Sequence, residues 1–207
     1  MPTASPRKTA ATPAASPVPD IAPLRLATAK AWETWLRKNG KTSDGVWLQI
    51  AKAGAAAPTV TYAQAIDAAL CHGWIDGQKK TLDDQHWLQR FTPRRARSLW
   101  SKINCAKALA LIEAGRMQPA GQAQVDAARA DGRWEQAYDG ARTSTVPADL
   151  QAALDASPDA QQFFATLNAT NRYAVLWRVQ TATKAETRAR RIATLVAMLA
   201  RGEKFHA

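Results

Sequence analysis

The pattern of hydrophobic residues changes once along the chain, at Pro93, and this change constrains the fold more than any other feature. Before Pro93, apolar and polar residues alternate over 46–52, 74–80 and 85–91, which is the period of a β-strand. After Pro93, apolar residues recur every three or four positions, which is the period of a helix. The strands are too few and too close for a doubly wound parallel sheet. We therefore expect an α+β fold, with a small, mostly antiparallel sheet and helices in the N-terminal half and only helices in the C-terminal half.

Capping residues predict where several helices begin. Thr28 is placed to cap the first helix, and Thr61 with Gln64 has the spacing of a capping box at the start of the second. Thr183 and Glu186 repeat that spacing before the last helix. The helix predicted over 102–114 is expected to turn its apolar residues toward the core: Ile103, Ala106, Leu109, Ala110 and Ile112.

The composition divides the chain into three parts. Residues 1–23 are rich in Ala, Pro, Ser and Thr, and too few apolar side chains are present there to form a core, so this part is predicted to be a disordered tail. Residues 24–116 are predicted to form the α+β domain, and residues 117–207 a helical C-terminal region packed on it.

The composition also indicates where in the cell the protein is expected. No stretch approaches the ~20 apolar residues that a transmembrane helix needs, and the N-terminus has no apolar segment of the kind found in secretory signals. The chain has two cysteines, fewer than a small secreted scaffold would carry, which suggests a reducing compartment. We therefore expect a cytoplasmic protein without a transmembrane segment.

Two segments account for all of the net charge of +11. Residues 79–107 contain eight Lys and Arg against two Asp, residues 172–204 contain eight against two Glu, and the rest of the chain is close to neutral. Such segments attract anions, so an anionic partner is expected, either a nucleic acid or a small ligand with a phosphate or carboxylate group. A solvated face without any partner would have the same composition.

Aromatic residues are interleaved with the cations of the first segment, and this combination favours contact with a nucleobase beside a phosphate. The alternative is that the tryptophans anchor the core and the arginines form a solvated rim. In the last helix, basic residues recur at spacings of three and four, which would place them on one exposed face. The candidate ligand-binding residues are Trp74, Asp76, Trp87, Arg90, Arg94, Arg95, Arg97, Trp100, Lys102, Arg188 and Arg191.

Reactive side chains are densest over residues 71–77, which include Cys71, His72 and Asp76. Cys71 is expected near the C-terminus of a helix, where the helix dipole raises the pKa of a thiol and disfavours a thiolate nucleophile. Asp76 is expected to form a salt bridge with a basic residue of the same sheet, with acid–base chemistry as the alternative. No CxxC or HxxxH spacing is present, and we predict no metal site, no cofactor and no catalytic residue.

Several uncommon strings occur in a fixed order along the chain: ALCHGWIDG over 69–77, RFTPRR over 90–95, SLWSKIN over 98–104, GRM over 115–117, NRY over 171–173 and ETR over 186–188. Together they resemble the YdeI/OmpD-associated family of bacterial proteins, and the resemblance covers about residues 28–204. His72 departs from the family pattern, which has an aromatic residue such as Phe at this place. The family is labelled as related to bacteriocin protection and implies no agreed reaction.

The resemblance implies a non-enzymatic binding protein with a role in stress protection against antimicrobial peptides or bacteriocins. Most such peptides are cationic and a chain of charge +11 would repel them, so protection is expected to be indirect, through an anionic partner or a stress response. The alternative is a nucleic-acid-binding protein that uses residues 87–102 and the basic face of the last helix. Contact with ~6 phosphates would then give a log–log salt slope of about −5.

Overall fold

The computed structural model describes residues 22–206, so nearly all of the predicted tail lies outside the described residues. The described chain forms eight helices and three strands, which confirms the α+β prediction. None of these helices is long and apolar enough to cross a membrane. The elements are α1 Ala29–Asn39, β1 Val46–Ala51, α2 Tyr62–Cys71, β2 Trp74–Thr81, β3 His86–Pro93, α3 Lys102–Glu113, α4 Pro119–Ala130, α5 Ala148–Asp155, α6 Pro158–Thr166, α7 Ala169–Gln180 and α8 Ala185–Ala200.

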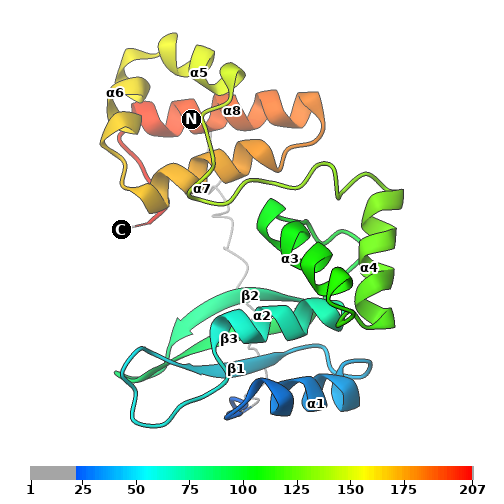
Figure 1. Cartoon of the computed structure of the whole chain (residues 1–207). Coiled ribbons are helices and arrows are strands. Elements are labelled where there is room, and N and C mark those ends of the chain that lie inside the picture. The colour runs from blue at the N-terminus through cyan, green and yellow to red at the C-terminus, as the bar shows by residue number, and fades with distance from the viewer. Residues whose placement is uncertain (1–21, 207) are drawn as a thin grey trace, which may run out of the picture.

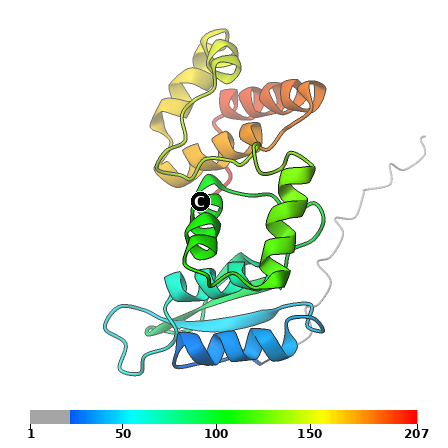
Figure 2. The same cartoon turned by 45° about the vertical axis from the view of Figure 1, so that its right-hand side comes forward.

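The molecule is elongated, with the sheet at one end and α5–α8 at the other (Figures 1 and 2). The three strands form an antiparallel sheet in the order β1-β3-β2, in the places that the alternating pattern predicts. The register of β2 shifts between Asp76 and Lys79, and the side chain of Gln89 donates hydrogen bonds of 2.8 and 3.2 Å to the carbonyls of Gly77 and Gln78 at this bulge. Within the described sheet, β2 has a strand partner on one side only.

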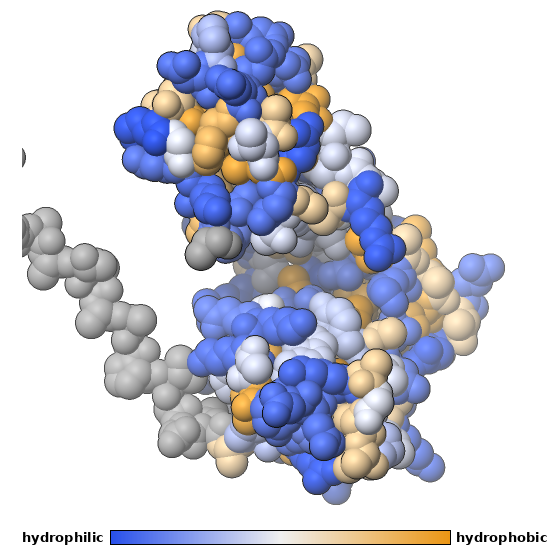
Figure 3. All heavy atoms as spheres, turned by 90° about the vertical axis from the view of Figure 1, so that its left-hand side faces the viewer, coloured by the Kyte–Doolittle hydropathy of each residue, from blue (hydrophilic) through white to orange (hydrophobic). Residues whose placement is uncertain are grey.

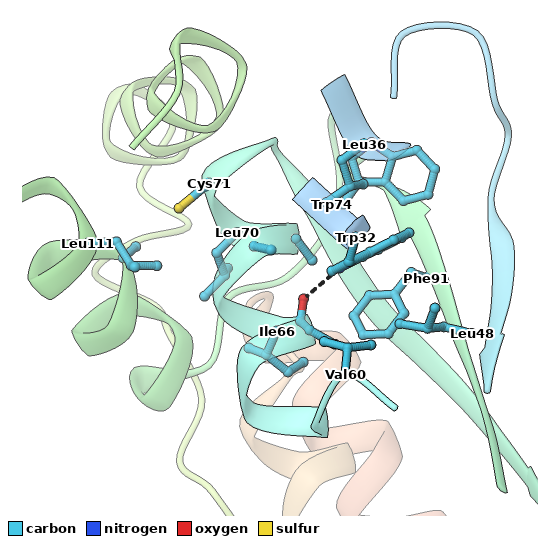
Figure 4. Close-up of a cluster of buried hydrophobic side chains, with 14 of the residues drawn as sticks. Trp32, Leu36, Leu48, Val60, Ile66, Leu70, Cys71, Trp74, Phe91 and Leu111 are labelled. Carbon is cyan, nitrogen blue, oxygen red and sulfur yellow. Dashed lines mark hydrogen bonds between the residues drawn. The ribbon is translucent and has the colours of Figure 1, made fainter. Parts of the chain in front are cut away.

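Helices α1 and α2 pack together on one face of the sheet, around Trp32 (Figure 4). The indole Nε1 of Trp32 donates a hydrogen bond of 3.1 Å to the carbonyl of Ala65 in α2. Its ring also lies near two aromatic rings of the sheet, with centroid distances of 5.5 Å to Phe91 and 6.3 Å to Trp74. Trp32 is completely buried, and it joins both helices and the sheet into the first hydrophobic core.

The capping predictions have different outcomes. Thr28 caps α1 as predicted, and the capping box at the start of α2 is complete. The capping box predicted for the last helix is wrong, because α8 begins at Ala185 with Lys184 at its N-cap and no side-chain cap. Thr183 therefore lies one position outside the N-cap, and Glu186 instead faces Arg190 at 3.7 Å.

Helix α3 buries a different face from the predicted one. Cys105, Ala108 and Leu111 enter the core, whereas Ile103 and Leu109 are 55% and 45% exposed. The sequence KINCAKALALIE places apolar residues on several sides of the helix, so periodicity alone does not select a face. The packing of α3 against α2 determines which face of α3 is buried.

Helix α4 also belongs to the first core, although the predicted boundary at residue 116 assigns it to the C-terminal region. Val125 and Ala128 are buried in the same cluster as the sheet residues. The approach of α4 to the end of α2 is close, because a side chain at Gly121 would overlap the carbonyl oxygens of Leu70 and Cys71. Helices α5–α8 enclose a separate second core, centred on residues such as Leu150, Phe164, Val175, Leu195 and Leu199.

Replacement of Trp32 by Ala should lower the free energy of unfolding by about 3–5 kcal/mol, because it leaves a large cavity where α1, α2 and the sheet meet. Leu109→Ala is the control, since Leu109 is half exposed and its loss should change the stability by no more than ~0.5 kcal/mol. Urea denaturation followed by circular dichroism measures both. A cost for Leu109→Ala as large as that for Trp32→Ala would contradict the observed face of α3.

Candidate ligand-binding cleft

A cleft of about 420 Å³ separates the two halves of the molecule, between the edge strand β2 and helix α7. Figure 3 shows the surface hollowed between the two halves. The walls come from β2, α3, the α4–α5 connection, α7 and the C-terminal residues. The lining residues are Ile75, Asp76, Gly77, Asn104, Tyr138, Thr170, Tyr173, Ala174, Trp177 and His206.

The α4–α5 connection forms the back of the cleft and is bonded to both halves. The backbone N–H of Tyr138 donates to the carbonyl of Trp100 at 3.0 Å, and its carbonyl accepts from the N–H of Lys102 at 2.9 Å. On the other side, the hydroxyl of Tyr173 in α7 donates to the carbonyl of Asp139 at 3.0 Å. These bonds fix the spacing between the first half and α7.

Three aromatic side chains line the cleft: Tyr138, Tyr173 and Trp177. The rings of Tyr138 and Trp177 are nearly perpendicular, with centroids 6.2 Å apart. Burial raises the pKa of Tyr173 to about 12, and burial together with the charge of Asp76 raises the pKa of Tyr138. Both phenols are therefore protonated at neutral pH and act as hydrogen-bonding groups on an apolar wall.

Asp76 supplies the carboxylate of the cleft. Its Oδ2 accepts a hydrogen bond of 2.7 Å from the hydroxyl of Tyr62 at the start of α2. Burial and this bond raise the pKa of Tyr62 above its usual value, so its proton stays on the phenol. The expected salt bridge is not formed, since no Lys or Arg among residues 22–206 lies within 4.0 Å of this carboxylate. The carboxylate faces the cleft without a cationic partner.

Arg94 is buried beside the cleft and does not line it. Only 6% of the residue is exposed, its guanidinium lies 3.6 Å from the ring centroid of Trp100, and one nitrogen donates to the carbonyl of Leu99 at 3.1 Å. Its Nε and Nη2 have no hydrogen-bond partner among the described residues. Burial lowers the pKa of Arg94 to about 10, so it remains charged at neutral pH, and its charge acts on Tyr138.

The tryptophan candidates Trp74, Trp87 and Trp100 belong to the first core or pack against it, and none of them lines the cleft. Trp74 is 1% exposed, and its Nε1 donates to the carbonyl of Gly40 at 3.2 Å inside the first core. Trp100 is also buried, 2% exposed. Trp87 is half-buried under the ammonium of Lys79, which lies 4.3 Å from its centroid. These positions agree with the alternative interpretation of the tryptophans as core anchors.

The basic candidates do not share one surface. Arg90 lies on the sheet face opposite α1 and α2, with its guanidinium 5.8 Å from the ring centroid of Trp47. Arg95 and Arg97 are exposed in the loop after β3. Lys102 is exposed and forms an ion pair of 2.9 Å with Asp139.

The two candidates in α8 face inward instead of forming an exposed stripe. Arg188 donates to both carboxylate oxygens of Asp149 at 2.6 and 2.9 Å, and also to the carbonyl of Val179 at 2.8 Å. Arg191 donates to the carbonyl of Arg178 at 2.8 Å. Both arginines therefore fasten α8 to the end of α7. Sequence periodicity cannot distinguish such a brace from a solvated basic face.

Of the candidate residues predicted from the sequence, only Asp76 lines the cleft. The spacing of Tyr173 and Trp177 on α7 is visible in the sequence, but it is also the spacing of a core stripe. The lining residues that sequence reasoning missed as site residues are Ile75, Gly77, Asn104, Tyr138, Thr170, Tyr173, Ala174, Trp177 and His206.

The cysteines lie outside the cleft. Cys71 and Cys105 are buried and free, and burial raises the pKa of Cys71 and raises that of Cys105 to about 11. Within residues 22–206, no group of three His, Cys, Asp or Glu side chains is arranged to hold a metal ion.

The contribution of the Arg188–Asp149 ion pair to stability is expected to depend on pH. The hydrogen bond from Arg188 holds the pKa of Asp149 below its usual value. The stabilisation by this pair is therefore fully present above the pKa of an aspartate in the unfolded chain, about 3.9. It is lost as the pH falls below that value and through the lower pKa of Asp149 in the folded protein. Asp149→Asn should lower the stability at pH 7 by less than ~1 kcal/mol, since the pair is partly exposed, and its difference from the wild type should shrink as the pH falls toward 3.

Thermal unfolding of both proteins between pH 7 and pH 3 measures this difference. Asp84→Asn serves as the control, because Asp84 is exposed and forms no ion pair with any residue that the structure describes. A difference between Asp149→Asn and wild type that is unchanged at pH 3 would show that the carboxylate is not stabilised by Arg188.

Two family models match separate parts of the chain. Residues 24–124, which include β2 and Asp76, match a model described as a domain of unknown function (DUF8412). Residues 143–202, which include α7, match the model described as "Bacteriocin-protection, YdeI or OmpD-Associated". No curated protein and no solved structure matches the chain. The comparison thus supports the resemblance to the YdeI/OmpD-associated, bacteriocin-protection family over residues 143–202, which form the helical region.

Proposed function

We propose that the chain is a non-enzymatic, cytoplasmic binding protein that holds a small ligand in the cleft between β2 and α7. The observation that carries this proposal is the position of Asp76, a carboxylate without a cationic partner on a wall of three aromatic rings. The cleft volume of about 420 Å³ lies within the usual range of small-molecule sites, ~300–1,000 Å³.

The chemistry of the walls selects the ligand class. The rings of Tyr138, Tyr173 and Trp177 suit a flat apolar group, and their faces attract a cation. Asp76 accepts hydrogen bonds and carries the opposite charge. These features favour a ligand with an amine next to an aromatic or otherwise flat group.

The net charge of +11 opposes a cationic ligand at long range. At physiological ionic strength, however, screening limits exposed charges to about 8 Å, so the groups that line the cleft dominate. The charge of Arg94 acts on Tyr138 and Asp76 and works against an amine. Because Arg94 is buried behind the lining residues while Asp76 lines the cleft, the carboxylate makes the direct contact.

The titratable groups favour binding over catalysis. The phenols of Tyr62, Tyr138 and Tyr173 all have raised pKa values, which makes them poor proton acceptors at neutral pH. The thiols of Cys71 and Cys105 are buried elsewhere. We propose that protection against bacteriocins, the role in the family description, operates through the ligand of this cleft.

Two indoles of opposite charge test the proposal. Tryptamine and indole-3-propionate share the ring and an ethylene spacer and differ in the terminal amine or carboxylate. Tryptamine should bind about tenfold more tightly, equivalent to ~1.4 kcal/mol, and Asp76→Asn should remove most of this preference. Isothermal titration calorimetry measures the affinities, with Asp84→Asn as the matched control.

Tighter binding of indole-3-propionate than of tryptamine would contradict the proposal. An unchanged preference in Asp76→Asn would place the indole site elsewhere on the molecule.

Nucleic-acid binding stays a prediction. Arg94 and Arg188, two of its candidate residues, are engaged inside the protein, while Arg95 and Arg97 are exposed. Fluorescence polarisation with labelled DNA at several salt concentrations tests it, and the sequence argument predicts a log–log slope of about −5. No binding at micromolar protein and low salt would contradict it.

A further inference from the structure

A second cavity, of about 540 Å³, lies between α7, α8 and the last described residues. Leu99, from the loop that follows β3, reaches it from the first half of the molecule. We name this cavity the α7–α8 groove. Its lining residues are Leu99, Trp177, Arg178, Thr181, Arg190, Arg191, Thr194, Leu195, Met198 and Phe205.

The α7–α8 groove has an apolar floor. Leu195 is buried in the second core, and Trp177, Met198 and Phe205 are half-buried beside it. Leu99 is 36% exposed at the edge. Such a surface gains free energy when an apolar chain or ring covers it, at ~25 cal/mol per Å² removed from water.

Three arginines surround this floor: Arg178, Arg190 and Arg191. The lining residues include no Asp or Glu. Burial and the neighbouring charge of Arg191 lower the pKa of Arg178, so two guanidiniums are held close enough to repel each other. Arg190 faces Glu186 at 3.7 Å, but both side chains are largely exposed, and an exposed pair of this kind contributes little.

Two of the arginines are held in place before any ligand arrives. Nη1 of Arg191 donates to the carbonyl of Arg178 at 2.8 Å and to the hydroxyl of Thr181 at 3.2 Å. The guanidinium of Arg178 lies 3.5 Å from the ring centroid of Phe205 and donates to the carbonyl of Ala174 at 2.7 Å. Side chains fixed in this way lose little conformational entropy when an anion binds.

We propose that the α7–α8 groove binds a single-chain amphiphilic carboxylate of the fatty-acid type. The carboxylate lies between Arg190 and Arg191, where it offsets the repulsion between Arg178 and Arg191 and accepts charge-assisted hydrogen bonds. The alkyl chain covers Trp177, Met198 and Phe205. The groove shares Trp177 with the cleft, but the cleft is lined by a carboxylate and takes a ligand of the opposite charge.

Decanoate below its micelle concentration is the probe, with decanol and decyltrimethylammonium as ligands of matched chain length. Calorimetry with the full chain should show decanoate binding at least tenfold more tightly than either. Arg190→Gln should weaken decanoate binding about three- to tenfold. Thr194→Glu places a carboxylate in the groove at an exposed helix position and should abolish binding. Arg142→Gln, which removes an exposed arginine outside the groove, should have no effect.

A second variant, Thr194→Trp, fills the groove without a change in charge and should also abolish decanoate binding. Far-UV circular dichroism establishes that each variant is folded. Equal affinity for decanoate and decyltrimethylammonium would overturn the proposal. So would wild-type affinity in both Thr194 variants. Capture of the protein by phosphatidylglycerol vesicles, without binding of monomeric decanoate, would overturn it in favour of a membrane-facing surface.

Discussion

The hydrogen bonds around Tyr138 and Asp139 determine how the two halves of the molecule face each other. The backbone of Tyr138 is bonded to Trp100 and Lys102 in the first half, and the carbonyl of Asp139 accepts from Tyr173 in the second. Each half has its own hydrophobic core, so neither core alone sets the distance between β2 and α7. The cleft depends on this short connection.

The sequence predicts the elements well, because their signals are local. The alternation over β1, β2 and β3 and the caps at Thr28 and Thr61 involve residues close together in the chain. The buried face of α3 and the start of α8 were predicted wrongly. In α3, apolar residues lie on several sides and only contact with α2 selects among them, while Thr183 has the right spacing but lies one residue too early.

The sites are less predictable because they depend on tertiary contacts. A sequence shows that Arg94 and Arg188 are basic, but not that one stacks under Trp100 or that the other pairs with Asp149, 39 residues away. Among residues 22–206, these two arginines are therefore engaged with other parts of the protein and do not add to an exposed basic face. The chain has an acidic, aromatic cleft between the halves and an arginine-lined apolar groove in the helical half, which suit ligands of opposite charge.

The most direct measurement of the central claim uses the eight tryptophans, whose indole N–H groups give separate signals in a ¹⁵N–¹H correlation spectrum. Trp177 lines both the cleft and the α7–α8 groove, whereas Asp76 lines the cleft alone and Trp32 and Trp74 are buried in the first core. On titration with tryptamine, we predict that the signal of Trp177 shifts, that those of Trp32 and Trp74 stay in place, and that Asp76→Asn removes most of the shift. Shifts confined to tryptophans outside the cleft, with Trp177 unchanged, would contradict the proposal.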